Sequence, residues 1–257
     1  MPSLLTDTLV YELSVEPQGR SGPENMARDQ ALLEAADRTG RAFLRLYRFE
    51  PPCLSFGRNE PAVARYDRAA IARRGLAVVR RPTGGRAVWH EHEVTYAVAA
   101  PEAAFGSLRE AYRAIHARLA AALRSLGADA TLAPHRPPST ALDRLPACFA
   151  APVGGEVLVA GRKVIGSAQV RLGNAFLQHG SVLLDGTQDV IDAVSHQPSA
   201  VSQATTLSAA LGRRVSFAEV ADAIVEAWRD DLTFTACDRP PPPSTALFFD
   251  AAWTWRR

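Results

Sequence analysis

Lysine is almost absent from this sequence. Of its 257 residues, 28 are arginine and Lys163 is the single lysine. A coding bias toward arginine explains the 28, but it does not explain the exception. An ammonium is a compact point charge and a guanidinium is a planar fork, so the two groups serve different sites. Lys163 is therefore a candidate for a functional residue.

Cysteine is also scarce. The three cysteines, Cys53, Cys148 and Cys237, are an odd number and show no metal-ligand spacing. This argues against a disulfide framework and favours a reducing cytoplasm. The segment Met1–Ser14 has no basic stretch leading into a long apolar run, so no signal peptide is expected. No apolar run approaches the ~20 residues that a membrane span needs.

The sequence also lacks an excess of charge of either sign. Lys plus Arg number 29 and Asp plus Glu number 27, which gives a net charge of +2 and does not indicate a nucleic-acid or membrane-surface binder. With 47% hydrophobic residues the composition is that of a globular protein. No break in composition divides the chain. We expect a single domain over residues 1–257, with residues 230–257 as a C-terminal tail that begins near the Pro240–Pro243 run.

Hydrophobic periodicity predicts alternating strands and helices. Asn25 is expected to cap a helix over Met26–Arg38 that ends at Gly40, and a capping box of Ser216 and Glu219 precedes a helix to Trp228. Other predicted elements are a helix over Leu108–Leu126, strands over Phe43–Phe49, Leu76–Arg81, Arg86–Ala100 and Phe176–Leu184, and a hairpin of Glu156–Ala160 with Lys163–Arg171. The fold class is α/β or α+β, with a mixed, mostly antiparallel sheet flanked by helices.

Three segments are dense in residues that bind or react. The first runs from Arg80 to His90, where Thr83, Gly84 and Gly85 form a turn between strands. Paired glycines let backbone N–H groups approach a ligand oxygen. Arg80, Arg81 and Arg86 flank the turn and offer charge for an anion such as a phosphopantetheine or nucleotide phosphate. A plain hairpin with solvated arginines is the alternative.

The second segment holds Cys148, which follows a long proline-rich loop. A cysteine on a loop acts as a nucleophile where a nearby cation stabilises its thiolate. The alternative is a small buried side chain, which is the interpretation for Cys53 and Cys237.

The third segment joins Lys163 to Gly166, Ser167 and Ala168, and is followed by His179 and Gly180. Lys163 opens a strand that then becomes apolar, so its ammonium is expected to face a cleft and polarise an acyl carbonyl or hold a thiolate. The small residues after it allow a ligand to lie against the sheet. A surface lysine at a hairpin turn is the alternative.

The run His90-Glu91-His92-Glu93 invites a metal hypothesis. In a strand the two histidines face one side and the two glutamates face the other. Two ligands without a third make a poor site, so no metal is expected.

Taken together, these strings resemble the lipoate-protein ligase and octanoyltransferase superfamily, which shares its catalytic fold with biotin protein ligases. They are RRPTGGRAVWHEHEVTYAV (80–98), GRKVIGSAQVR (161–171) and LQHGSVLL (177–184). Cys148-Phe149 shortly before GRKVIGSAQ is most similar to the LipM-type octanoyltransferases.

The resemblance implies a catalytic Cys148 that carries an octanoyl group and a catalytic Lys163 that orients the acyl carbonyl. It implies octanoyl-acyl carrier protein as donor, and a lysine of a lipoyl domain or a glycine-cleavage H protein as acceptor, with no cofactor. The implied substrate-binding residues are Arg81, Thr83, Gly84, Gly85, Arg86, His90, Gly166, Ser167, Ala168, His179 and Gly180. An apolar tunnel for the chain is expected among the valines and leucines of these strands, at about 0.8 kcal/mol per buried CH₂.

The chain departs from the family pattern after Cys148, where residues 150–155 replace acidic and aromatic residues, and at Glu91-His92. Three alternatives therefore stay open. They are an ATP-dependent lipoate-protein ligase, an amidotransferase between lipoyl domains, and a catalytically silent acyl or lipoyl-domain binding protein.

Overall fold

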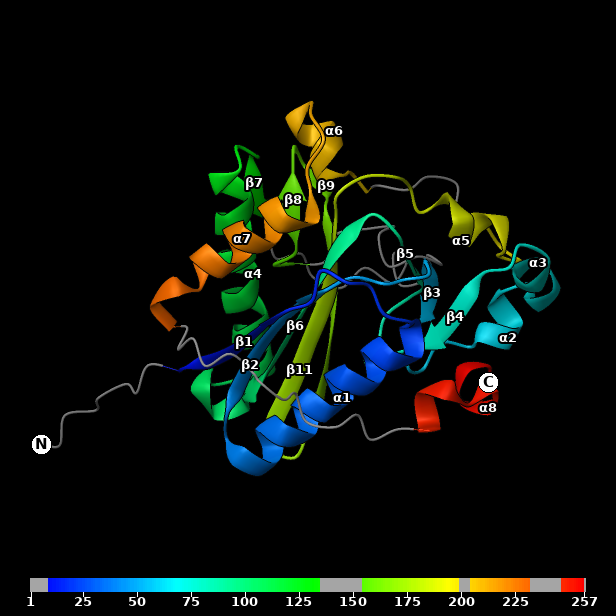
Figure 1. Cartoon of the computed structure of the whole chain (residues 1–257), viewed down its shortest axis with the longest axis horizontal. Coiled ribbons are helices and arrows are strands. Elements are labelled where there is room, and N and C mark those ends of the chain that lie inside the picture. Colours follow the sequence, from blue (N-terminus) through cyan, green and yellow to red (C-terminus); the bar gives the residue numbers. More distant parts are fainter. Residues whose placement is uncertain (1–8, 135–153, 199–203, 232–245, 257) are drawn as a thin grey trace, which may run out of the picture.

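A five-stranded sheet forms the centre of the molecule (Figure 1). The computed structural model describes residues 9–134, 154–198, 204–231 and 246–256. The strand order is β1-β2-β6-β11-β10, where the strands are β1 (Tyr11–Val15), β2 (Ala42–Tyr47), β6 (Glu93–Pro101), β11 (Ala175–Leu183) and β10 (Ile165–Leu172). β1 and β2 are parallel, and the other three pairings are antiparallel. The predicted mixed, mostly antiparallel sheet is confirmed.

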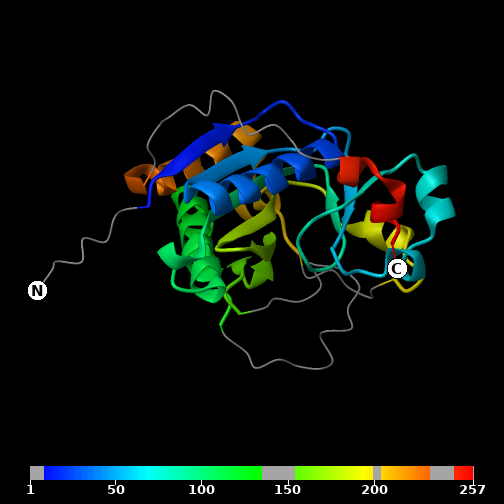
Figure 2. The same ribbon diagram turned by 90° about the horizontal axis from the view of Figure 1, so that it is seen from below.

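Helices cover both faces of this sheet (Figures 1 and 2). α1 (Gly22–Thr39) packs on one face, where it shares a core with Phe43 and Tyr47 of β2. α4 (Leu108–Ser125) and α7 (Phe217–Ala227) pack on the other, against Leu44 and Leu46 of the same strand. Alternate residues of β2 thus point to opposite faces, which explains why the whole strand is buried.

A second, three-stranded sheet lies at one end of the first. Its order is β4 (Ala77–Arg80), β3 (Cys53–Phe56), β5 (Val88–His90), with α2 (Ala62–Arg65), α3 (Arg68–Arg73) and α5 (Asp189–Ala193) around it. The predicted single strand Arg86–Ala100 is therefore wrong. The chain changes sheets between His90 and Glu93, since β5 pairs with β3 and β6 pairs with β2 and β11.

A small third sheet carries the predicted hairpin. β7 (Ala130–Leu132), β8 (Val157–Val159) and β9 (Arg162–Lys163) pair in that order. Ala160 and Gly161 both have positive φ, 49° and 74°, as a two-residue hairpin turn requires. The predicted strand Lys163–Arg171 is divided at Val164, because Lys163 pairs with β8 whereas Ile165 begins β10 of the central sheet.

The N-terminal caps of α1 and α7 differ in detail from those predicted. α1 begins after Ser21, not Asn25, because Ser21 and Glu24 form the capping box. The fully buried Asn25 instead donates to the carbonyls of Arg20 and Arg48. Ser216 caps α7 as predicted, but the carboxylate of Glu219 binds Arg213, so the box is not reciprocal.

The last residues fold back against α1 and β4. Here η4 (Ala246–Phe249) and α8 (Ala251–Thr254) belong to the expected C-terminal tail, and Phe248 is buried in the core beneath α1. The remaining short helices are η1 (Glu102–Ala104), α6 (Leu207–Leu211) and η3 (Arg229–Asp231). Within the described ranges, no helix combines the length and apolar character that crossing a bilayer would require.

Candidate active site

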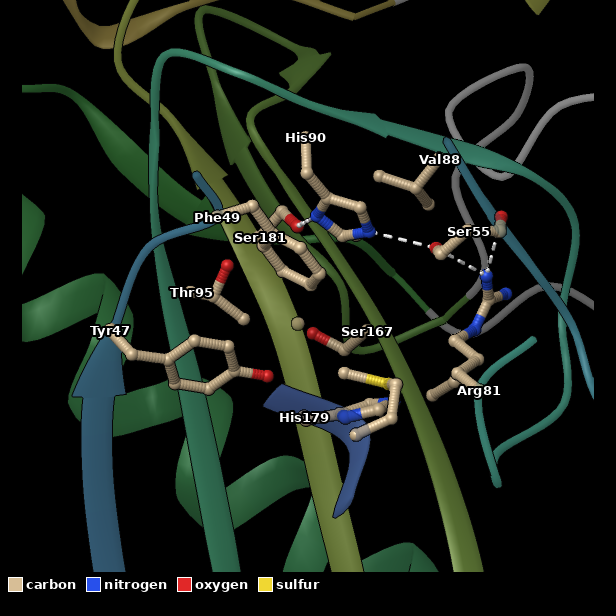
Figure 3. Close-up of a pocket in the computed structure, with 14 residues that line it drawn as sticks. Tyr47, Phe49, Ser55, Arg81, Val88, His90, Thr95, Ser167, His179 and Ser181 are labelled. Carbon is tan, nitrogen blue, oxygen red and sulfur yellow. Dashed lines mark hydrogen bonds between the residues drawn. The ribbon is translucent and has the colours of Figure 1, made fainter. Parts of the chain in front are cut away.

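A pocket opens where the central five-stranded sheet meets the β4-β3-β5 sheet (Figure 3). The space inside it that is open to the centre of a water-sized sphere is about 20 Å³, which is room for about one water molecule, so the pocket is narrow. Seven of the predicted substrate-binding residues line it: Arg81, His90, Gly166, Ser167, Ala168, His179 and Gly180. The structure thus brings together segments that are about ninety residues apart in the chain.

The sequence analysis missed the other half of the lining. These residues are Met26, Tyr47, Phe49, Ser55, Val88, Thr95 and Ser181. They come from α1, from the ends of β2 and from β3, β5, β6 and β11, so no local motif announces them. A tunnel of valines and leucines was expected. Among the described residues that line this pocket Val88 is the one valine or leucine, and hydroxyl and imidazole groups share the wall with aromatic rings.

Arg81 holds the predicted glycine turn in place. Its guanidinium donates to the carbonyls of Ser55, Gly84 and Arg86 and to the hydroxyl of Ser55, at 2.6–3.2 Å. A Cβ added to Gly57 would lie 2.0 Å from the carbonyl oxygen of Gly85, so the turn packs directly on backbone. Arg81 is thus a structural part of the pocket wall.

Arg80 does not serve the pocket. Its side chain is fully buried and donates to backbone carbonyls of the Gly57–Glu60 loop and of the C-terminal segment. The expectation that Arg80 supplies charge to an anion in the pocket is therefore not met, because its hydrogen bonds go to backbone carbonyls and it is absent from the lining. Arg81 differs, because it lines the pocket and also donates to the hydroxyl of Ser55 there. Arg86 is half-buried in the turn beside them.

His179 is fixed by a buried network. Its Nδ1 lies 2.7 Å from the carboxylate of Asp29 and its Nε2 lies 2.6 Å from the hydroxyl of Thr83. Asp29 also accepts from Tyr47 at 2.7 Å and from Arg45 at 2.8 Å. Burial lowers the pKa of His179, against the raising effect of Asp29. Thr83, predicted to bind substrate, thus orients a residue of the wall.

Lys163 is buried and paired with a carboxylate. Its Nζ lies 2.5 Å from Oε1 of Glu156, and the two side chains are 1% and 4% exposed. Both residues belong to the β8–β9 hairpin or its edge, and Lys163 lies three positions before Gly166 of the pocket. The alternative of a surface lysine is therefore excluded. Glu156 was not singled out from the sequence, because its pairing with Lys163 follows from the hairpin register.

A second buried histidine links this hairpin to the pocket. His116 of α4 lies with Nδ1 2.7 Å from the carbonyl oxygen of Gly155 and Nε2 2.9 Å from the hydroxyl of Ser167. Burial lowers the pKa of His116 to about 4, and the positive charge of Lys163 acts in the same direction. His116 is therefore neutral near pH 7. A lone histidine in an amphipathic helix gave no signal in the sequence.

The predicted nucleophile Cys148 lies outside the described residues, as do Cys237 and residues 150–153 of the altered loop. Cys53 is fully buried, and burial raises its thiol pKa, which confirms the interpretation as a small core side chain.

The histidine–glutamate run does not alternate as predicted. His90 and Glu93 are buried and bonded to each other at 2.7 Å, whereas Glu91 is half-buried and His92 is exposed. The arrangement differs because the chain turns between β5 and β6 instead of continuing as one strand.

Comparison with known proteins agrees with this architecture. Residues 21–229 match the lipoyl protein ligase A/B catalytic domain. The chain is 40% identical over 218 residues to octanoyltransferase LipM of Moorella thermoacetica, covering 79% of this chain and 80% of the relative. It is 45% identical over 185 residues to octanoyltransferase LipM of Kyrpidia tusciae, covering 68% and 66%.

The fold agrees as well. A crystal structure of lipoate-protein ligase A bound with ATP superposes with a TM-score of 0.72 at 21% identity, covering 87% of each chain. By its fold, its pocket and the match over residues 21–229, this chain belongs to the lipoyl protein ligase A/B catalytic-domain family.

Proposed function

We propose that this protein is an octanoyltransferase of lipoate biosynthesis. The observation that carries the proposal is the identity of 36–45% to octanoyltransferases over about two thirds or more of the chain. The acyl donor is octanoyl-acyl carrier protein, and the acceptor is a lysine of a lipoyl domain or of a glycine-cleavage H protein. The reaction takes place in the cytoplasm, where free thiols persist.

The reaction proceeds in two acyl transfers. In the first, the thiolate of Cys148 attacks the thioester carbonyl of the donor, and the carrier leaves as its thiol. In the second, the ε-amine of the acceptor lysine attacks the Cys148 thioester, which gives an amide and returns the thiol. The exchange between thioesters is nearly isoenergetic and the amide is more stable than the thioester, so no ATP is consumed. Cysteine suits the first step because its thiolate is the reactive form.

Lys163 supports both steps from a fixed position. Glu156 holds its ammonium in a buried pair, three residues from the pocket segment Gly166–Ala168. A fixed positive charge near the reacting carbonyl stabilises the oxyanion of each tetrahedral intermediate and the thiolate of Cys148. We place the acyl chain in the pocket between Phe49, Val88 and the β10–β11 wall, whose free space of about 20 Å³ must widen to admit it. Arg81, Thr83, Gly84, Gly85 and Arg86 form the rim and support of that pocket.

The test is a transfer assay without ATP. The purified chain, octanoyl-acyl carrier protein and a lipoyl domain are incubated, and the mass of the lipoyl domain is followed. We expect one octanoyl group on one lysine. An acceptor that is modified only when ATP and free lipoate are supplied would identify an ATP-dependent ligase instead. Binding of octanoate without any modification would identify a silent binding protein.

A further inference from the structure

Two residues of the pocket, Ser55 and His90 (Figure 3), are arranged with the neighbouring Glu93, which is not part of the lining, as a serine–histidine–acid triad. The hydroxyl of Ser55 lies 2.7 Å from Nε2 of His90, and Nδ1 of His90 lies 2.7 Å from Oε1 of Glu93. These contacts match those of a serine nucleophile, its general base and the acid that orients the base. Ser55 and His90 line the pocket, and Glu93 lies behind the ring. We propose that Ser55, His90 and Glu93 form a second acyl-transfer centre that hydrolyses medium-chain acyl esters and thioesters.

The protonation of His90 follows from its partners. A carboxylate only accepts, so Nδ1 carries the hydrogen that faces Glu93. In the neutral ring Nε2 is then an acceptor, and the hydroxyl of Ser55 donates to it. This is the arrangement in which a histidine takes the proton of a serine hydroxyl as the oxygen attacks.

The ring is held firmly in this orientation. Phe49 stacks on it with 4.0 Å between centroids and 19° between planes. Ser181 places its hydroxyl 3.1 Å from Nδ1, and Thr95 donates to the same Glu93 oxygen that faces His90. Ser55 is fully buried, and Glu93 and His90 are 3% and 6% exposed. A preorganised, water-poor site of this kind is what acyl transfer requires.

One oxygen of Glu93 is unexplained by packing. In the part of the chain that the structure describes, Oε2 of Glu93 has no hydrogen-bond partner although it is buried. A buried carboxylate oxygen without a partner costs stability and is typical of a functional group. Here the carboxylate would be stabilised when His90 becomes an imidazolium beside it during the reaction.

Arg81 supplies the positive charge next to the nucleophile. Its Nη1 donates to the hydroxyl oxygen of Ser55 at 3.0 Å. A guanidinium there favours the alkoxide and lies close to the place where the oxyanion of a tetrahedral intermediate forms. Asp29, by contrast, faces His179 and not the triad.

The position of the triad suits the reactive end of an acyl group. In the β10–β11 register Ser181, which contacts His90, pairs with Gly166. Lys163 lies three residues before Gly166, so the Cα atoms of these two residues are at most about 11 Å apart. The carbonyl that Lys163 polarises under the proposed function would thus lie toward the same end of the pocket as Ser55. This step rests on that function, but the triad geometry does not.

The chemistry balances with water as the acceptor. Ser55 Oγ attacks the carbonyl and its proton passes to His90 Nε2, which then protonates the departing alcohol or thiol. Water attacks the acyl-serine, again giving a proton to His90, and the carboxylic acid leaves as Ser55 regains its hydrogen. The net reaction converts one ester or thioester and one water into an acid and an alcohol or thiol.

The test uses the full chain carrying Cys148→Ala, so that no octanoyl thioester can form at that cysteine. It is treated with an octyl fluorophosphonate, and the labelled peptide is identified by mass. Hydrolysis of 4-nitrophenyl octanoate is measured in parallel. We expect one phosphonyl group on Ser55, and a loss of hydrolysis of about 100-fold or more when Ser55→Ala or Glu93→Gln is added. Ser125→Ala on α4, the same change at an exposed site, is the matched control.

Absence of label on Ser55, or hydrolysis unchanged by Ser55→Ala, would overturn the proposal. Because labelling is read in a chain that keeps Ser55, a variant that fails to fold does not decide the outcome. Failure of the proposed octanoyltransferase is separable: there, a chain with intact Cys148 transfers no octanoyl group although Ser55 is labelled.

Discussion

Lys163 and Glu156 are the residues that set the electrostatics next to the pocket. A buried ammonium is tolerated only when a counter-charge and hydrogen bonds replace its water shell. Glu156 provides this at 2.5 Å, and its own position is fixed by the β7–β8–β9 sheet. The scarcity of lysine therefore has a structural counterpart, since the single ammonium of the chain occupies a buried site shaped for a compact cation.

We expect Lys163→Arg to lose activity although the charge is kept. The planar guanidinium is larger than an ammonium and does not fit the same contact with Glu156. Octanoyl transfer should fall by about 100-fold or more, the loss typical when one oxyanion-stabilising donor is removed. The reverse exchange at the adjacent exposed residue, Arg162→Lys, is the control and should have little effect on the rate. Turnover of Lys163→Arg near the wild-type rate would remove Lys163 from the mechanism.

The sequence allowed the residues of continuous motifs to be predicted but not their partners. Arg81, His90, Ser167 and His179 belong to contiguous strings and line one pocket, while their role in binding substrate stays a prediction. Asp29, Glu156 and His116 were missed because each acts on a residue brought to it by strand register or helix packing. Such contacts depend on tertiary structure, which a local pattern does not encode.

The β10–β11 pair is the element on which the pocket is built. Gly180 faces Ser167 across this pair, and a Cβ at Gly180 would lie 2.5 Å from the carbonyl oxygen of Gly166 and from the hydroxyl of Ser167. The carbonyl oxygen of Gly166 belongs to the backbone and is not able to move aside as a side chain would. A glycine is required there because the strands approach a ring, that of Tyr96, as well as each other.

Gly180→Ala should accordingly lower the free energy of unfolding by about 1–3 kcal/mol, the usual cost of overpacking. Urea denaturation gives this value. Gly84→Ala is the matched control, because a Cβ at Gly84 would have nothing within 4 Å, and its effect should be within about 0.5 kcal/mol. Equal losses in the two variants would contradict the account of the β10–β11 wall.

The points at which two of the predicted strands divide were also not predictable from the sequence. The strands predicted over 86–100 and 163–171 each divide, because one part of each pairs in a small sheet and the other in the central one. A switch between sheets leaves hydrophobic alternation intact, so period alone does not reveal it.

At the scale of the whole molecule, the C-terminal segment is held against β4 by hydrogen bonds. Arg80, fully buried on β4, donates to the carbonyls of Trp253, Thr254 and Arg256, and Trp253 Nε1 donates back to the carbonyl of Arg80 at 3.0 Å. Residues 246–256, the part of the tail that the structure describes after residue 231, therefore pack beneath α1 and against β4, and none of them lines the pocket. That the whole chain forms one domain stays a prediction, and the hydrogen bonds between Arg80 and the C-terminal segment support it.

Removal of residues 246–257 should destabilise the protein by about 3 kcal/mol or more, because buried donors of a charged group lose their acceptors. Arg80→Lys should cost a comparable amount, since three donors do not replace the guanidinium fork. Arg73→Lys, at an exposed arginine of α3, is the control and should change the unfolding free energy by less than about 0.5 kcal/mol. Unfolding curves that coincide for the shortened and full-length chains would show that the C-terminal segment does not contribute to the stability of the fold.

Acylation of Cys148 is tested by the intact mass of the protein after incubation with octanoyl-acyl carrier protein in the absence of ATP. We expect an increase by one octanoyl group, located on Cys148, released by neutral hydroxylamine as a thioester is, and absent from Cys148→Ala. A wild-type chain that gains no octanoyl thioester, or a Cys148→Ala chain that gains the same one, would contradict it.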